Sequence, residues 1–205
     1  MAAAPLAVIA CGALAHEIVA IVRANGLDHM RLHCLPAILH NHPERIAPRV
    51  EAAIVAARKA GAGDVLVAYG DCGTGGALAR VAERHGAAML PGAHCYAFFE
   101  GVERFAARDE IDAFYLTDFL ALHFESFVVR PLKLREHPEL RTMMFAHYGR
   151  VVHLAQRADP QTDAAAQAAA DFLALPLERR QTGYGALRDA LQPSAAAGER
   201  ASASP

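Results

Sequence analysis

Residues 64–76 read DVLVAYGDCGTGG, and this stretch is the clearest guide to the fold. After Asp64 the run 65–69 is apolar and has the length of a buried β-strand, whereas Gly70, Gly73, Gly75 and Gly76 make the following segment a loop. Helical spacing of apolar residues begins at residue 76 and ends near residue 85. A strand, a glycine-rich turn and a helix in this order form the repeating unit of α/β proteins with parallel sheets.

The same unit recurs on both sides of this stretch. Further apolar runs predict strands at residues 6–10, 30–34, 87–90 and 150–154, and helical spacing is found at residues 14–24 and 43–60. We therefore predict a single α/β domain over residues 1–192. Its mainly parallel sheet would have about five strands and helices on both faces, as in doubly wound, Rossmann-like folds.

Two segments depart from this pattern. After Pro91 and Gly92 the chain becomes aromatic near helical spacing, which predicts a helical segment that covers one end of the sheet and supplies core residues. These aromatic residues are Phe98, Phe99, Phe105, Phe114, Tyr115, Phe119, Phe124 and Phe127. Residues 193–205 are mostly Ser, Ala, Gly and Pro, so we predict a disordered tail there.

Composition narrows the possible partners and the location. The chain has 20 basic and 22 acidic residues, so no positive field would attract nucleic acid or an anionic membrane. Its four cysteines show no CxxC spacing and are too few for a disulfide-stapled domain, which favours reduced thiols in the cytoplasm. No basic residue precedes Arg23, so a secretion signal is not expected.

The cysteines fall at informative places on this map. Cys11, Cys34, Cys72 and Cys95 each lie at or just beyond the carboxyl end of a predicted strand, the edge at which open parallel sheets bind ligands. Strands are about 4.8 Å apart, so three such thiols can converge on one metal ion, whereas four in a row would span about 14 Å. We expect Cys34 to be the exception, as a small buried apolar residue before Leu35 and Pro36.

The neighbours of the other three cysteines suggest how such a site is built. His40 follows the second predicted strand and is a candidate fourth ligand or proton carrier. Backbone N–H groups of glycine-rich loops can turn toward an anion or a metal-bound sulfur. The predicted ligand-binding residues are Gly12, Gly70, Asp71, Gly73, Gly75 and His94. The loop matches neither a Walker motif nor GxGxxG, which leaves nucleotide binding as a weaker alternative.

Several motifs resemble those of an uncharacterised family of bacterial and archaeal proteins. They include Ala10-Cys11-Gly12-Ala13-Leu14, Leu35-Pro36 with Leu39-His40, Tyr69-Gly70-Asp71-Cys72-Gly73, Pro91 with Cys95, and Tyr115-Leu116-Thr117. Members of that family are often encoded beside corrinoid-dependent methyltransferases for methylamines and betaines. The resemblance implies a three-cysteine site at Cys11, Cys72 and Cys95 with His40 nearby, in a setting of one-carbon metabolism, but it implies no particular reaction.

These observations lead to three hypotheses, and they leave open whether the protein is an enzyme. In the first, Cys11, Cys72 and Cys95 bind zinc and leave a position open for a small-molecule ligand or substrate, with an iron–sulfur cluster as the alternative cofactor. In the second, the protein is a metal-free thiol enzyme whose nucleophile is Cys72 at a helix amino terminus. In the third, it is a non-catalytic accessory protein that binds a methyltransferase or corrinoid protein through the aromatic segment.

Overall fold

The computed structural model describes residues 5–191, whose strands form two parallel sheets. The first sheet has the order β2-β1-β3-β4 and the second has the order β5-β6-β7. The strands are β1 (Leu6–Cys11), β2 (Met30–Leu35), β3 (Asp64–Ala68), β4 (Ala88–Met89), β5 (Ala113–Thr117), β6 (Arg150–Ala155) and β7 (Leu177–Gln181). Every strand pair is parallel, which confirms the predicted α/β class.

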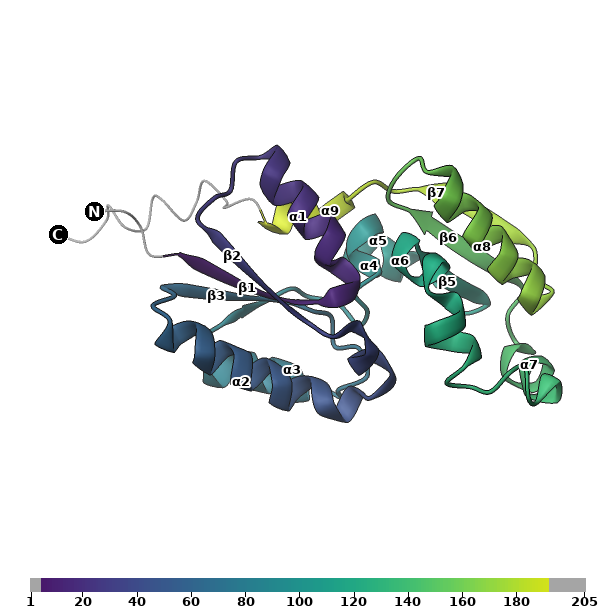
Figure 1. Cartoon of the computed structure of the whole chain (residues 1–205), viewed down its shortest axis with the longest axis horizontal. Coiled ribbons are helices and arrows are strands. Elements are labelled where there is room, and N and C mark those ends of the chain that lie inside the picture. Colours follow the sequence, from purple (N-terminus) through teal and green to yellow (C-terminus); the bar gives the residue numbers. More distant parts are fainter. Residues whose placement is uncertain (1–4, 192–205) are drawn as a thin grey trace.

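Helices follow most strands, as a parallel sheet requires. The α-helices are α1 (Ala15–Ala24), α2 (Ile46–Lys59), α3 (Ala77–Arg84), α4 (Ala97–Glu100), α5 (Val102–Arg108), α6 (Asp118–Leu122), α7 (Pro138–Phe145), α8 (Pro160–Leu173) and α9 (Gly185–Leu191). Shorter turns are η1 (Gly12–Leu14), η2 (Ala37–Asn41), η3 (Pro43–Arg45) and the π-helical η4 (Glu125–Val129). In Figure 1, α1 covers one face of the first sheet while α2 and α3 cover the other.

The centre of the first sheet is β1, which pairs with β2 on one side and β3 on the other. Its residues Val8, Ile9 and Ala10 are fully buried, as expected for a strand covered on both faces. Because the chain winds outward from β1 in both directions, the topological switch point lies between β1 and β3. Cys11 ends β1 and Cys72 follows β3, so both lie beside this switch point.

The predicted pairing of the last strand is wrong. Residues 150–154 do form a strand, β6, but β6 pairs with β5 and β7 in the second sheet instead of extending the first. β5 lies inside the aromatic segment predicted to be helical, because a short apolar run is compatible with either a strand or a helix. β7 was not predicted, because its sequence LERRQ shows no alternation of apolar and polar residues. Among the described strands it pairs with β6 alone, and such an edge strand can carry charged side chains.

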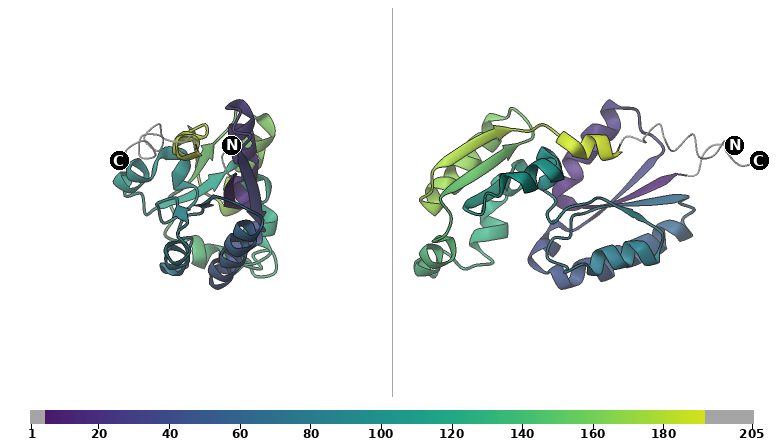
Figure 2. Two further views of the ribbon diagram at one scale, coloured as in Figure 1. Left: turned by 90° about the vertical axis from the view of Figure 1, so that its left-hand side faces the viewer. Right: turned by 180° about the vertical axis from the view of Figure 1, so that it is seen from behind.

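Each sheet has its own hydrophobic core, and the chain passes between them twice. We call the first sheet with α1–α4 and α9 the first lobe, and the second sheet with α6–α8 the second lobe; Figure 1 and the right-hand view of Figure 2 show them side by side. Leu187 and Leu191 of α9 return to the core of the first lobe. A single domain over 1–192 stays a prediction, and the predicted tail at 193–205 lies outside the described residues.

No helix within residues 5–191 is long and apolar enough to cross a membrane.

The return of the chain to the first lobe depends on Gly185. Its φ is +45°, and a Cβ at this position would lie 1.9 Å from the carbonyl oxygen of Phe99 in α4. Gly183 also has a positive φ, of +59°, but a Cβ there would meet nothing within 4 Å. Both positions therefore require a positive φ, whereas Gly185 also requires that no side chain stand between α9 and α4.

We expect Gly183→Ala to lower the free energy of unfolding by about 1 to 2 kcal/mol, the cost of a left-handed alanine. Gly185→Ala carries the same cost, and it must also move α9 away from α4, which adds about 1 to 3 kcal/mol. Urea unfolding of both variants beside the unmodified protein measures the difference. Equal stability of the two variants would contradict this account of the α4–α9 contact.

Candidate functional site

A cavity of about 810 Å³ lies between the two lobes. The first lobe lines it with residues from the carboxyl ends of β1 and β3, from η2 and from the loop after β4. The second lobe lines it with β5, α6, η4 and α7. The cavity therefore occupies the position at which open parallel sheets bind ligands.

Two cysteines meet at the wall of this cavity. The sulfur atoms of Cys72 and Cys95 are 3.2 Å apart. Two backbone hydrogen bonds hold their loops together, from Asp71 N–H to Gly92 O and from Cys72 N–H to Ala93 O, both at 2.8 Å. The Gly70 N–H also donates to the sulfur of Cys95 at 3.3 Å. The pair is thus positioned by the backbone of the two loops.

The loop from Gly70 to Gly76 is shaped for this close approach. A Cβ on Gly70 would lie 2.8 Å from the carbonyl carbon of His94, so only glycine lets the loops come this near. The Asp71 carboxylate accepts hydrogen bonds from the Thr74 hydroxyl at 2.7 Å and from the Gly76 N–H at 2.8 Å. Cys72 itself has a φ of +49°, an uncommon conformation for a residue with a side chain.

The three cysteines of the cavity differ in their protonation. Hydrogen bonds from Cys95 and from His40 lower the pKa of Cys72 to about 5, despite its burial. The pKa of Cys95 is raised, because this thiol donates to Cys72 and is partly buried. Burial raises the pKa of Cys11 to about 11. The geometry thus favours the thiolate form at Cys72 and the thiol form at Cys95 and Cys11.

A buried hydroxyl lies beside one of these sulfur atoms. Tyr69 lines the cavity and is 1% exposed, and its hydroxyl lies beside the Cys11 thiol. Within residues 5–191 this hydroxyl makes no hydrogen bond of ordinary geometry. Because an unsatisfied buried hydroxyl is costly, the cavity is suited to a ligand that brings a polar atom to Tyr69.

The remaining walls are mostly aromatic. A stacked row crosses from the first lobe to the second, with ring centroids 4.9 Å apart for His94 and Tyr96 and 5.5 Å apart for Tyr96 and Tyr115. Other aromatic rings in the lining are Phe99, Phe114, Phe119, Phe127, Phe145 and Tyr148. No Asp, Glu, Lys or Arg is among the lining residues that the structure describes. Most of the aromatic segment thus lines the cavity as well as supplying core.

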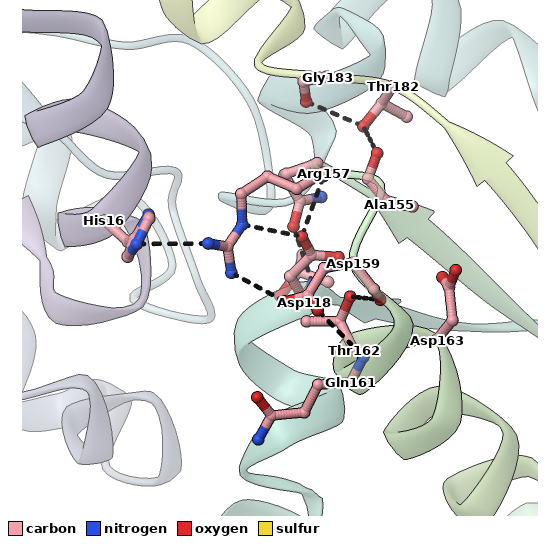
Figure 3. Close-up of polar contacts among 12 residues, drawn as sticks. His16, Asp118, Ala155, Arg157, Asp159, Gln161, Thr162, Asp163, Thr182 and Gly183 are labelled. Atoms are coloured by element: carbon pink, nitrogen blue, oxygen red, sulfur yellow. Dashed lines mark hydrogen bonds and ion pairs between the residues drawn. The ribbon is translucent and has the colours of Figure 1, made fainter.

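The second lobe's wall is fixed by a buried polar network, drawn in Figure 3. Asp118, directly after β5, accepts hydrogen bonds from the Arg157 N–H at 3.1 Å and shares one with Nε2 of His153 at 2.9 Å. The Arg157 guanidinium lies 3.4 Å from Nε2 of His16 on α1, so it also joins the two lobes. Beside them the Glu17 carboxyl is buried, which raises its pKa.

The structure brings together the cysteines that the sequence singled out. Cys11, Cys72, Cys95 and the candidate ligand His40 all line the cavity, as does His94. The other predicted ligand-binding residues, Gly12, Gly70, Asp71, Gly73 and Gly75, are not among the lining residues. Gly70 and Asp71 act on the loop and its sulfur atoms, as described above, and any direct contact of the five with a ligand stays a prediction.

Two local expectations need correction. Cys34 is exposed on β2 and not buried, because β2 is an edge strand that pairs only with β1. Cys72 does not lie at the helix amino terminus, since residues 73–76 separate it from α3. Its lowered pKa therefore arises from Cys95 and His40 and not from the helix.

No group of three or more His, Cys, Asp or Glu side chains among the described residues is arranged so that it could hold a metal ion. The predicted zinc and iron–sulfur sites thus rest on the shared cavity and not on a formed coordination sphere.

These features define an α/β protein in which two parallel sheets enclose a cysteine-lined, largely aromatic cavity. Residues 34–191 match the model of a family described as "Protein of unknown function (DUF1638)", and the chain belongs to this family. The matched range includes Cys72 and Cys95 but begins after Cys11. No curated protein and no solved structure gives a significant match.

The thiolate at Cys72 predicts a distinctive pH dependence of alkylation. In a Cys34→Ser background, we expect the rate of Cys72 modification by iodoacetamide to be constant at neutral pH and to fall only as the pH drops through about 5. Cys95→Ala removes the donor to the thiolate and should raise the midpoint by more than about one pH unit. Cys11→Ala is the control and should leave it unchanged. Peptide mass spectrometry measures the rates, and a midpoint near 8.5 before any cavity substitution would rule out the thiolate.

Proposed function

We propose that the protein is a thiol enzyme that binds a small, largely apolar molecule between its lobes and attacks it with the Cys72 thiolate. The observation that carries the proposal is the 3.2 Å contact between Cys72 and Cys95 at the wall of the 810 Å³ cavity. A thiolate, rather than a thiol, is the reactive nucleophile of cysteine. The contact supports a thiolate at Cys72 where a bound molecule can reach it.

The other groups of the cavity fit definite roles. The Cys72 sulfur would form a bond to an electrophilic carbon, and the electron pair of the broken bond would depart with the leaving group. His40 and Cys95, both hydrogen-bonded to the Cys72 sulfur, are placed to protonate that group. The Tyr69 hydroxyl is free to bind a polar atom of the substrate, and the aromatic walls would bind its apolar body.

A pair of matched probes tests this proposal. N-benzyl iodoacetamide and iodoacetate carry the same reactive carbon and the same leaving group, but only the first is neutral and aromatic. The measured quantity is the rate of modification by N-benzyl iodoacetamide divided by the rate of modification by iodoacetate. In the Cys34→Ser background, we expect this ratio to be about tenfold or more higher for Cys72 than for free cysteine, since burial of one aromatic ring contributes about that factor.

Phe127→Ala, which removes one ring of the cavity wall, should lower this preference while the reaction with iodoacetamide itself stays unchanged. Phe105→Ala is the matched control, because Phe105 packs on Tyr96 and Tyr115 without being among the lining residues. If both probes react with Cys72 in the same ratio as with free cysteine, the cavity does not bind the apolar part of a substrate and the proposal is wrong.

Metal binding by the same cysteines is the second candidate function. What favours it is that Cys11, Cys72, Cys95 and His40 line one cavity, although a metal-free nucleophile needs only one of the three thiols. These four residues would hold zinc, which would polarise a bound ligand and stabilise the thiolates. An iron–sulfur cluster is the alternative cofactor. This candidate comes second because no formed group of metal donors is found within residues 5–191.

Elemental analysis and a visible spectrum of anaerobically purified protein decide between the two functions. For the thiol enzyme, we expect less than about 0.1 equivalent of zinc or iron, because a preformed thiolate needs no ion. About one equivalent of zinc that is lost in Cys11→Ser, Cys72→Ser and Cys95→Ser would instead establish the metal site. A brown protein with the same dependence would establish the iron–sulfur cluster, and Cys34→Ser is the control that should change neither result.

The resemblance found in the sequence suggests a setting for either chemistry. We propose a role in one-carbon metabolism beside a methyltransferase or corrinoid protein, in a cytoplasm that keeps the thiols reduced. A purely accessory role would need an exposed aromatic surface. From Phe98 to Phe127 every Phe and Tyr is buried or half-buried, which makes a catalytic or ligand-binding role the better-supported reading.

A further inference from the structure

A second cavity, of about 500 Å³, lies where the chain returns from the second lobe to the first. It is lined by α4 and α5, by the carboxyl end of β7 and by the first residues of α9. Four arginines face it: Arg104, Arg108, Arg180 and Arg188. The acidic side chains among its described lining residues are Glu100 and Asp189, so the lining carries more positive than negative charge.

Two of these arginines belong to the wall. Glu100 is 95% buried at its side chain, and it accepts a hydrogen bond from Arg108 at 3.1 Å while Arg180 lies 3.7 Å away. Arg180 also donates to both oxygens of Glu110 at 2.8 Å and to Glu178 at 2.6 Å. Each nitrogen of the Arg180 guanidinium thus has a carboxylate partner, and the negative charge of Glu100 is balanced by its two arginine neighbours.

The other two arginines keep their charge available. Arg104 on α5 makes no hydrogen bond or ion pair with any residue of the described chain. Among the described residues, Arg188 on α9 pairs with the adjacent Asp189 alone, which is 3.6 Å away and 72% exposed. Such an exposed pair contributes little, so Arg188 can turn to another anion. Gly185 allows α9 to contact α4, and this contact brings Arg188 to the same cavity as Arg104.

We propose that this cavity is a binding site for an oxyanion, either a phosphate group or a carboxylate of a small molecule, held between Arg104 and Arg188. A guanidinium presents its N–H groups in a planar fork that matches the oxygens of both groups. Arg108 uses its Nε–H to donate to Glu100, and its other N–H groups can supply a third contact to the anion. The evidence for this site does not depend on the thiol chemistry proposed above.

The cavity is also linked to the first one through the protein. Arg180 holds Glu110, and Glu110 accepts a hydrogen bond of 2.5 Å from the hydroxyl of Tyr115, whose ring lines the thiol cavity. Phe99 contributes to both linings. An anionic co-substrate or effector in the second cavity would thus lie against the same wall as a molecule beside Cys72.

Calorimetric titration of the full chain tests the site, with inorganic phosphate and succinate as probes at a constant ionic strength set with sodium chloride. We expect saturable binding of at least one probe at millimolar or lower concentration. Arg104→Ala and Arg188→Ala should each weaken it by about tenfold, the effect of one charged hydrogen-bonded partner. Binding of phosphate alone assigns a phosphate ligand, and binding of succinate alone assigns a carboxylate.

Arg49→Ala is the matched control, because Arg49 is an exposed arginine of α2 that does not line the cavity. It should bind the probes as the unmodified protein does. Thermal unfolding shows whether each variant is folded, and Arg104→Lys, which keeps the charge without the fork, should recover part of the affinity. Absence of saturable heat for both probes, or equal weakening by Arg49→Ala, would overturn the proposal, since only general charge screening would then remain.

Discussion

The site depends on two backbone hydrogen bonds, from Asp71 to Gly92 and from Cys72 to Ala93, that join the loops after β3 and β4. They place two sulfur atoms in contact, and this contact lowers the pKa of Cys72. Glycine at position 70 is the condition for both bonds, because a side chain there would collide with His94. Asp71 fixes the same loop from within. The lowered pKa of Cys72 therefore follows from the backbone conformation of these two loops.

The second lobe converts this reactive edge into an enclosed site. Without β5, α6 and η4, the carboxyl edge of the first sheet would be open to water on the side of the cysteines. The aromatic side chains of this lobe lower the polarity around the thiolate, and a charge of this kind interacts more strongly with a ligand where water is excluded. The buried network around Asp118 and Arg157 keeps that wall in place relative to α1.

The sequence predicted the first lobe well and the second poorly, for a physical reason. Strands such as β1 and β3 are buried on both faces and read as continuous apolar runs, and the glycines after them mark the turns. β5 is a short apolar run that is compatible with a strand or a helix, and β7 is charged, so neither carries such a signal and the split into two sheets could not be foreseen. The grouping of Cys11, Cys72 and Cys95 followed from strand ends alone, whereas Tyr69 and the contact of Cys72 with Cys95 depend on loop geometry that no spacing encodes.

The return of α9 to the first lobe has a consequence for biosynthesis. Leu187 and Leu191 complete a core whose other members begin at Ala7, so the packing of the amino-terminal lobe is complete only after nearly the whole described chain has been synthesised. The second lobe, whose core lies between Leu116 and Leu173, is contiguous and can fold earlier. Until α9 is made, the apolar surface that it covers stays exposed, and transiently exposed apolar surface of this kind favours aggregation.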